Sequence, residues 1–142
     1  VEQSVRVRVS PPAQTATNKQ GGCDLAKKVL VIDDDKIWQD LWARGLTRLV
    51  GSDIVIYKAL TIEEGEKRFF TSSKLAAVAI DACIPGSVVN TLPLVKKIRE
   101  HFSGPMIAIS SIETYQKKLI EAGCNYTCEK GRLAQKLVEI LR

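Results

Sequence analysis

Three consecutive aspartates, Asp33, Asp34 and Asp35, directly follow the apolar segment 29–32, whose sequence is VLVI. Adjacent carboxylates repel one another, so a buried strand that ends on them needs a compensating charge. Acidic side chains also cap helices and interact favourably with the positive end of the helix dipole. We interpret Asp35 only as a residue that begins the following helix, and we interpret Asp33 and Asp34 as candidate ligands for a hard cation.

Three more polar residues stand at the ends of later apolar segments. Asp81 ends the segment LAAVAID, Ser110 ends PMIAIS, and Lys130 follows YTCE. Mg²⁺ prefers oxygen ligands, often including phosphate oxygens, and a lysine and a hydroxyl suit an arriving anionic oxygen. Together these residue types describe a metal-assisted phosphoryl site in which one carboxylate is the nucleophile. The sequence contains no GxGxxG or GxxxxGKS loop for binding a nucleotide.

Five short apolar segments predict the strands that bring these polar residues together. The segments are residues 29–33, 53–59, 75–81, 105–110 and 126–129. Because they are apolar throughout rather than alternating, they suit a parallel sheet that is covered on both faces. The ligand site of such a sheet lies beyond the carboxyl ends of its strands. We therefore expect the polar residues described above to converge at this edge.

Helical patterns separate the predicted strands. The second helix begins with a capping box at 61–64, the third spans 88–102, the fourth spans 112–122 and the last spans 133–141. Five β–α units in this order predict an α/β fold, namely a five-stranded parallel sheet in a doubly wound (βα)5 flavodoxin-like sandwich. The first helix is expected to bury one apolar stripe, formed by Ile37, Leu41, Leu46, Leu49 and Val50.

Composition excludes several classes of protein. The chain has 142 residues, of which 45% are hydrophobic and 26% charged, which is ordinary for one soluble domain. A net charge of +5, partly concentrated before residue 29, is too small to indicate nucleic-acid binding. No apolar run approaches the roughly 20 residues of a membrane span, and no signal peptide is evident, so we expect a cytoplasmic location.

The four cysteines, Cys23, Cys83, Cys124 and Cys128, form no CxxC pair and lie near no histidine cluster. A zinc site is therefore not expected, and the cysteines are interpreted as small buried residues in a reducing compartment. Residues 1–26 contain the polar, turn-rich stretch SPPAQTATNKQGG. They are interpreted as an N-terminal extension or linker, or as the tail of a preceding domain, before a domain spanning 27–142.

Four motifs in order, VLVIDDDK, DACIPGS, PMIAISS and EAGCNYTCEKG, resemble the CheY-like receiver domains of two-component response regulators. The resemblance spans about residues 27–142. It implies that Asp81 is the phospho-acceptor, which receives a phosphoryl group from a phosphohistidine on a partner. It further implies that Asp33, Asp34 and Asp81 hold Mg²⁺, with the backbone carbonyl of Cys83 as an additional ligand.

By the same resemblance, Ser110 is the switch hydroxyl and Lys130 pairs with the acceptor or its phosphoryl group. The implied donor is a histidine kinase or a histidine phosphotransfer protein, and the implied output is a switched surface that binds a downstream protein target. The chain is then either a stand-alone regulator or the C-terminal receiver of a hybrid histidine kinase. It would catalyse at most its own phosphorylation and dephosphorylation, and no nucleic-acid partner is expected.

The chain departs from the receiver pattern at four places. Gly131 stands where a proline usually follows the lysine, and Thr127 occupies the aromatic position three residues before it, with Tyr126 adjacent. Residues 87–91 form an altered loop, and Ser111 replaces a small alanine. These changes concern the coupling between the site and the output surface, whereas the residues of the phosphorylation chemistry are intact.

Two other functions fit parts of the sequence. A degenerate receiver could serve as a binding module without phosphorylation. A haloacid-dehalogenase-type phosphatase also begins with a strand and two aspartates spaced like Asp33 and Asp35, although Lys36 is not the Thr or Val of that motif. Trp38 and Trp42 are expected to pack against the core, with a docking surface for a partner as the alternative.

Overall fold

The computed structural model describes residues 26–142, so the predicted extension or linker lies, except for its last residue, outside the described residues. The described part of the chain forms one sheet of five strands in the order β2-β1-β3-β4-β5, and every neighbouring pair is parallel. This order confirms the flavodoxin-like prediction. The strands are β1 (Lys27–Ile32), β2 (Ile54–Ala59), β3 (Leu75–Asp81), β4 (Met106–Ile109) and β5 (Tyr126–Cys128).

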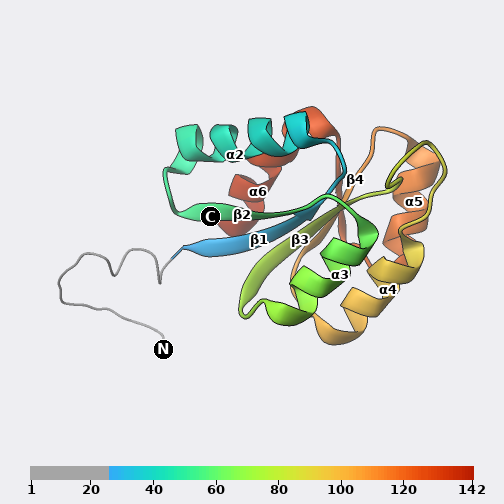
Figure 1. Cartoon of the computed structure of the whole chain (residues 1–142). Coiled ribbons are helices and arrows are strands. Elements are labelled where there is room, and N and C mark those ends of the chain that lie inside the picture. The colour runs from blue at the N-terminus through green and yellow to red at the C-terminus, as the bar shows by residue number, and fades with distance from the viewer. Residues whose placement is uncertain (1–25) are drawn as a thin grey trace.

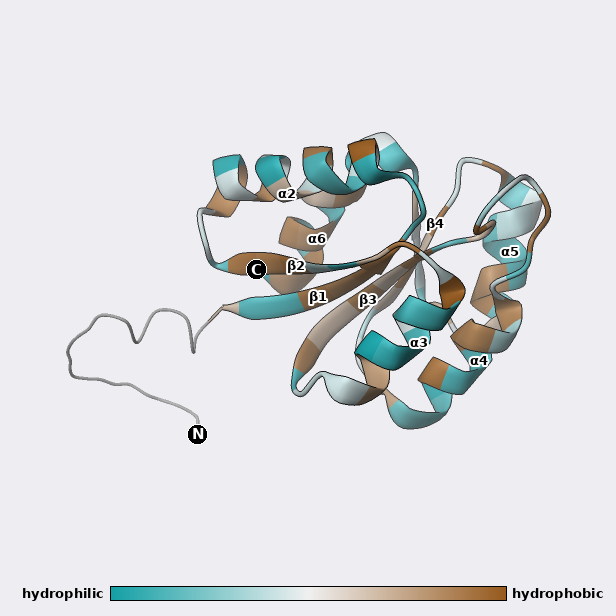
Figure 2. Ribbon diagram, in the orientation of Figure 1, coloured by the Kyte–Doolittle hydropathy of each residue, from teal (hydrophilic) through white to brown (hydrophobic). Residues whose placement is uncertain are grey.

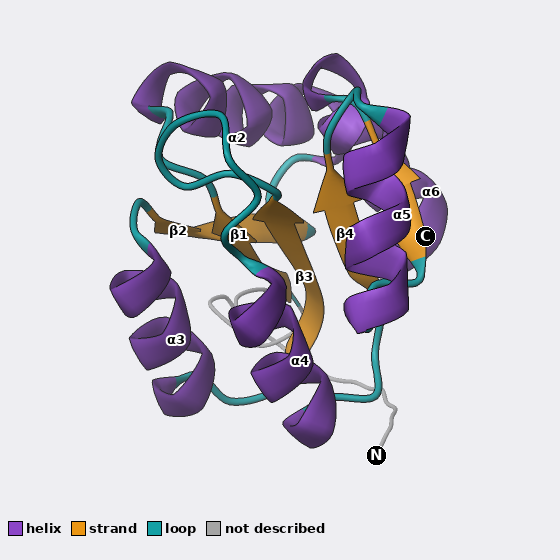
Figure 3. Cartoon of the chain, turned by 90° about the vertical axis from the view of Figure 1, so that its right-hand side faces the viewer, coloured by secondary structure: helices purple, strands orange, loops and turns teal. Residues whose placement is uncertain are grey.

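Helices cover both faces of this sheet (Figures 1 and 3). On one face lie α2 (Lys36–Val50) and α6 (Leu133–Leu141), which contact each other. On the other face lie α3 (Ile62–Thr71), α4 (Leu92–His101) and α5 (Glu113–Ala122). A short 3-10 helix, η1 (Lys130–Arg132), connects β5 to α6. The sheet is therefore the middle layer of three, as expected for strands that are apolar on both sides.

The strands β1 to β4 each supply side chains to two separate hydrophobic cores. In β1, Leu30 and Ile32 pack on the side of α3, α4 and α5, whereas Val29 and Val31 pack on the side of α2 and α6. Successive residues of a strand point to opposite faces, so a strand covered on both sides must be apolar at every position. The hydrophobic colouring of the central strands shows this pattern (Figure 2). The cysteines of the described residues are buried free thiols, and Cys23 lies outside these residues.

The apolar stripe predicted for the first helix is partly wrong. Ile37, Leu41 and Leu49 of that stripe are exposed, by 73%, 43% and 49% respectively. The step of five residues from Leu41 to Leu46 breaks the helical period, so both cannot face the sheet. The buried face instead follows spacings of three and four, and consists of Gln39, Trp42, Leu46 and Val50. Trp42 thus packs in the core as expected.

The ends of the helices follow local hydrogen bonding. In the predicted capping box, the Thr61 hydroxyl accepts a bond from the Glu64 N–H at 3.0 Å, and the Glu64 carboxylate accepts one from the Leu60 N–H. The third predicted helix begins at Leu92 rather than at residue 88, because the Asn90 side chain bonds both the N–H and the carbonyl of Ile84. These bonds close residues 84–90 into a loop, so the helix starts only after this loop.

Replacing Gly65 by alanine tests the contact between α3 and the sheet. A Cβ at this position would lie 2.8 to 3.0 Å from three side-chain atoms of the fully buried Ile32. We expect Gly65→Ala to lower the free energy of unfolding by about 1–2 kcal/mol, because overpacking outweighs the better helix propensity of alanine. Urea denaturation measures this change.

Gly131→Ala is the matched control, since no atom lies within 4 Å of a Cβ built there. It should leave the stability unchanged or slightly increase it. Adding Ile32→Val, which removes the nearest atom, should recover part of the loss in Gly65→Ala. Equal stability of Gly65→Ala and the wild type would contradict this packing.

Candidate functional site

Three carboxylates meet at the carboxyl ends of β1 and β3, which are neighbours in the sheet. Asp33 and Asp34 follow β1, Asp81 ends β3, and one carboxylate oxygen from each lies within 4.8 Å of the others. Asp33 is fully buried, Asp81 is partly buried and Asp34 is exposed. The predicted convergence of these residues is therefore present, and it concentrates negative charge at one edge of the sheet.

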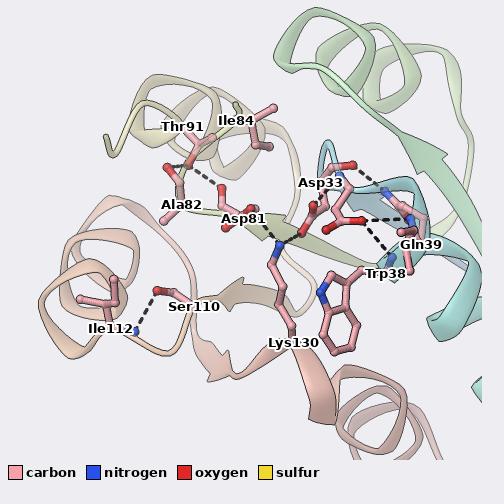
Figure 4. A network of polar contacts seen from close by, with 12 residues as sticks. Asp33, Trp38, Gln39, Asp81, Ala82, Ile84, Thr91, Ser110, Ile112 and Lys130 are labelled. Atoms are coloured by element: carbon pink, nitrogen blue, oxygen red, sulfur yellow. Dashed lines mark hydrogen bonds and ion pairs between the residues drawn. The ribbon is translucent and has the colours of Figure 1, made fainter. Parts of the chain in front are cut away.

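Lys130 supplies the positive charge of this cluster from the end of β5. Its Nζ lies 3.2 Å from Asp33 Oδ2 and 3.6 Å from Asp81 Oδ2, so it bridges the two carboxylates (Figure 4). Burial acts to lower the pKa of Lys130, but the charges of Asp33 and Asp81 outweigh it, and the net effect is a raised pKa. Lys130 therefore stays protonated and offsets one of the negative charges.

The carboxylates carry more negative charge than Lys130 neutralises. Burial raises the pKa of Asp33, although the Asp35 N–H and the Lys130 charge act against it. Burial, together with the nearby charge of Asp33, raises the pKa of Asp81 to about 6. These shifts mean that the charged forms of both groups are disfavoured in the folded protein. A second cation at this position would relieve that penalty.

The donor atoms fit a hard divalent cation. All three donor groups are carboxylates, and Mg²⁺ and Ca²⁺ prefer such oxygen ligands. Within residues 26–142, the buried Asp33 Oδ2 has no hydrogen-bond partner, apart from its ion pair with Lys130. Cys83 lines the cleft beside Asp81, and because Mg²⁺ and Ca²⁺ prefer oxygen donors, its backbone carbonyl suits such a cation better than its thiol.

Asp35 has a different role from the two aspartates before it. It is the N-cap of α2, and its carboxylate accepts hydrogen bonds from the N–H groups of Ile37 at 3.0 Å and Trp38 at 3.3 Å. Its own N–H donates to Asp33 Oδ1 at 2.9 Å. The structural role predicted for Asp35 is confirmed, and its N–H also orients the Asp33 carboxylate.

Gln39 holds the ends of β1 and β2 from within the core, a role that the sequence analysis missed. Its side chain is fully buried, and Nε2 lies 2.9, 3.1 and 3.2 Å from the carbonyl oxygens of Val31, Asp33 and Ala59. A glutamine among the apolar residues of the first helix was the available signal, because a buried amide needs polar partners. Gln39 thus fixes the backbone that carries Asp33.

Thr91 has a similar function behind Asp81. It is fully buried, and its hydroxyl lies 2.9 Å from the carbonyl oxygen of Asp81 and 3.1 Å from that of Ala82 (Figure 4). It therefore ties the start of α4 to the end of β3. Nothing in the sequence distinguishes Thr91 from other loop threonines, so its position could be found only in three dimensions.

Ser110 follows β4 and borders the same cleft as Asp81 and Lys130. The cleft has a volume of about 510 Å³, and its other walls include Ser87 and Tyr115. Ser110 is only 9% exposed, and its Oγ accepts a hydrogen bond from the Ile112 N–H at 3.1 Å. Since a hydroxyl can accept one bond and donate another, the Ser110 proton remains available to a group in the cleft.

The two candidates for the aromatic position on β5 face opposite sides of the sheet. Tyr126 packs against the core beneath α2 and α6, and the Lys136 ammonium lies over its ring. Thr127 points the other way and lines a pocket beside α5. Tyr126 therefore cannot replace an aromatic residue at 127. Instead, Tyr115 of α5 brings a hydroxyl to this side of the molecule, and it donates to the Ser87 carbonyl at 3.1 Å.

No protein-family model matches this sequence, and no curated protein matches it. Many solved structures share its fold. One is a CheY-like response regulator receiver domain protein from Methanospirillum hungatei JF-1, with a TM-score of 0.66 and 17% identity over 80% of this chain and 92% of that chain. Another is a two-component response regulator from Clostridium difficile, with a TM-score of 0.66 and 22% identity over 82% and 96% of the respective chains.

A third similar structure is a response regulator protein from Burkholderia pseudomallei with a phosphorylated aspartic acid, a calcium ion and citrate. It has a TM-score of 0.67 and 18% identity, and the match covers 82% of this chain and 66% of that chain. Receiver domains recur among the similar structures, so the resemblance seen in the sequence is confirmed for the fold. Among residues 26–142, no helix is both long and apolar enough to cross a membrane.

Replacing Asp81 by asparagine should stabilise the metal-free protein. Because the pKa of Asp81 is raised from 3.8 to about 6 by folding, its contribution to stability falls as pH rises between these values and stays low above pH 6. At pH 7.5 in EDTA, we expect Asp81→Asn to raise the free energy of unfolding by about 1–2 kcal/mol, allowing for partial solvent screening. The difference should shrink as the pH is lowered towards 4.

Asp40→Asn is the control for this experiment. The side chain of Asp40 is exposed, and its hydrogen bond and charge interaction with Lys58 lower its pKa. Ionisation of Asp40 therefore favours the folded state, whereas ionisation of Asp81 disfavours it. Asp40→Asn should therefore not stabilise the protein at neutral pH. Urea denaturation between pH 4 and 7.5 measures both variants. A loss of stability in Asp81→Asn at pH 7.5 would contradict the electrostatic description of the site.

Proposed function

We propose that residues 27–142 form a receiver domain of a two-component phosphorelay, which accepts a phosphoryl group from a phosphohistidine onto Asp81. One observation carries this proposal. A partly buried carboxylate, Asp81, lines an open cleft with a lysine ammonium 3.6 Å away and two further carboxylates beside it. A nucleophile, a fixed positive charge and a set of cation ligands thus occur together at the ligand-binding edge of an α/β sheet.

Similarity to solved structures supports the same function. The fold is that of response regulator receiver domains, and the regulator from Burkholderia pseudomallei carries a phosphorylated aspartic acid together with a calcium ion. In the present chain, Asp81 stands at the end of the central strand, beside the oxygen donors of Asp33 and Asp34. A phosphorylated aspartate and a divalent cation are therefore chemically compatible with this edge of the sheet.

We assign Asp33, Asp34, Asp81 and the backbone carbonyl of Cys83 as the residues that would hold Mg²⁺. When bound, Mg²⁺ would supply positive charge against the carboxylates and the oxygens of the phosphoryl group. Asp33 contributes a buried oxygen that lacks a hydrogen-bond partner in the described part of the chain. Asp34 is exposed and leaves the site open to solvent ions.

In the proposed reaction, a carboxylate oxygen of Asp81 attacks the phosphorus of phosphohistidine. A new O–P bond forms as the N–P bond breaks, and the bonding electrons remain on the imidazole nitrogen of the donor. The pKa of Asp81, about 6, leaves this carboxylate mostly ionised at neutral pH and so available as the nucleophile. The Lys130 ammonium lies close enough to Asp81 to stabilise the negative charge of the phosphoryl oxygens.

Ser110 would respond to the phosphoryl group. Its hydroxyl oxygen already accepts a bond from the Ile112 N–H, so its proton can be donated to a phosphoryl oxygen in the cleft. Movement of Ser110 would pull on the segment that leads into α5, and the populations of two surface conformations would shift. The coupling here differs from an aromatic switch on β5, since residue 127 is threonine and the nearby aromatic hydroxyl belongs to Tyr115.

The partners follow from this chemistry. The donor would be a histidine kinase or a histidine phosphotransfer protein, and the switched surface would bind a downstream protein target. The chain would act as a stoichiometric phospho-acceptor in signalling rather than as an enzyme with turnover on other substrates. We propose no interaction with nucleic acid, because the net charge of +5 is modest and is only partly concentrated, before residue 29.

Phosphorylation by a small donor tests the proposed function. We expect the wild-type protein to gain one phosphoryl group when it is incubated with acetyl phosphate and Mg²⁺, as measured by intact mass. Asp81→Asn should gain none, whereas Asp33→Asn keeps the acceptor and should be phosphorylated more slowly at the same Mg²⁺ concentration, because it binds the ion more weakly. Beryllofluoride with Mg²⁺ should bind the wild type and not Asp81→Asn.

Other outcomes identify the competing functions. A phosphoryl group that is lost in Asp33→Asn but retained in Asp81→Asn would indicate a haloacid-dehalogenase-type phosphatase. A wild type that gains no phosphate, and shows no Mg²⁺-dependent response to beryllofluoride, would indicate a binding module without phosphorylation. Either result would overturn the proposal.

Mg²⁺ alone should stabilise the folded protein, because the ion binds the folded site and not the unfolded chain. We expect the melting temperature to rise with Mg²⁺ concentration in the wild type and in Asp35→Asn. Asp35 is the matched control, since it adjoins the cluster but caps α2, and asparagine is an equally good cap. In Asp33→Asn the dependence should be strongly reduced. Equal Mg²⁺ responses of Asp33→Asn and Asp35→Asn in thermal unfolding would contradict the ligand assignment.

A further inference from the structure

Trp42 connects the core beneath α2 and α6 to the backbone of Lys130. The Trp42 side chain is only 3% exposed, and its indole N–H donates a hydrogen bond to the Lys130 carbonyl at 2.7 Å. This bond joins two segments that lie 88 residues apart in the sequence. The same residue, Lys130, directs its ammonium towards Asp33 and Asp81. Trp42 therefore contacts the candidate site without lining it.

The backbone at Lys130 belongs to a tight turn. The chain leaves β5 at Cys128 and enters the 3-10 turn at Lys130, where the Leu133 N–H also donates to the Lys130 carbonyl. Gly131 has no side chain, and no heavy atom lies within 4 Å of a Cβ built at this position. A glycine leaves the backbone more conformational freedom than other residues do. Among the hydrogen bonds of residues 26–142, the indole bond of Trp42 ties the backbone of this turn to α2.

The position of this backbone decides where the ammonium lies. Lysine reaches its partners through four flexible methylene groups, and each ordered bond costs conformational entropy. The Lys130 ammonium lies 3.2 and 3.6 Å from two carboxylates, which is a narrow geometry for a side chain that is 31% exposed. A displaced carbonyl would move the start of the side chain and lengthen at least one of these distances.

We infer that Trp42 is a positioning residue for Lys130, which fixes the backbone from which the ammonium reaches Asp33 and Asp81. The inference rests on the proposed function to the extent that Lys130 assists phosphoryl transfer. The hydrogen bond itself is independent of that function. Trp42 thus supplies the rigidity that Gly131 cannot provide after the lysine.

Trp38 offers a matched control. Its ring stacks on that of Trp42, with centroids 5.8 Å apart, but the ring makes no hydrogen bond within residues 26–142. Trp38→Phe and Trp42→Phe therefore remove the same atoms from neighbouring positions on α2, and only the second removes a donor to Lys130. Phenylalanine keeps an aromatic ring at each position, which limits the loss of packing.

The test compares the rate of phosphorylation by acetyl phosphate in these variants. We expect Trp42→Phe to lower the rate about threefold to tenfold, as for the loss of one buried hydrogen bond, with little change in the Mg²⁺ concentration required. Trp38→Phe should remain within about twofold of the wild type. In a Lys130→Met background, Trp42→Phe should cause no further decrease, because the group that it positions is absent.

A purely structural role of Trp42 gives a different result. Equal losses in Trp38→Phe and Trp42→Phe, or a loss from Trp42→Phe that persists in the Lys130→Met background, would overturn the inference. If the wild type is not phosphorylated at all, the proposed function fails. Nuclear magnetic resonance then tests separately whether Trp42 restrains the turn at Lys130. A restraining role predicts a slowly exchanging indole N–H in Trp42, and increased mobility of the Lys130 and Gly131 amides in Trp42→Phe only. Rapid exchange or unchanged mobility would overturn it.

Discussion

The carboxylates of Asp33, Asp34 and Asp81 repel one another at one edge of the sheet, and the surrounding contacts have to oppose this repulsion. One oxygen from each group lies within 4.8 Å of the others, and within residues 26–142 the ammonium paired with them is that of Lys130. Burial makes the charged state still less favourable, as the raised pKa values of Asp33 and Asp81 indicate. Left free, the strand ends would separate until water screened the charges. The fold must therefore hold these ends in place by other contacts.

Buried side-chain donors provide those contacts, and each holds the backbone of one charged residue. Gln39 donates to the carbonyl of Asp33, Thr91 to that of Asp81, and Trp42 to that of Lys130. Gln39 and Trp42 belong to α2, and Thr91 immediately precedes α4; the apolar faces of these two helices are anchored in the two cores. The arrangement has a cost, because the buried Oε1 of Gln39 has no partner within residues 26–142. The stability of the core is thus used to maintain an electrostatically unfavourable site.

The sequence predicts the charged groups of this site and misses the groups that hold them. Runs of β-type apolar residues predict the strands, and an aspartate or lysine at the end of such a run is conspicuous, so Asp33, Asp81 and Lys130 could be placed together. Gln39 and Thr91 are uncharged and belong to no repeating pattern, and their role depends on carbonyls that converge only after folding. The error in the stripe predicted for α2 has a different cause, because the step of five residues from Leu41 to Leu46 is visible in the sequence and does not fit one helical face.

A crystal structure with Mg²⁺ and beryllofluoride would show the acceptor, the ion and the lysine in one experiment. We expect beryllofluoride on a carboxylate oxygen of Asp81, the ion in contact with Asp33 and Asp34, and the Lys130 ammonium within hydrogen-bonding distance of a fluoride. Beryllofluoride bound to Asp33 would contradict the proposed function. The absence of any adduct at saturating Mg²⁺ and beryllofluoride, with Lys130 still paired to the carboxylates, would contradict it as well.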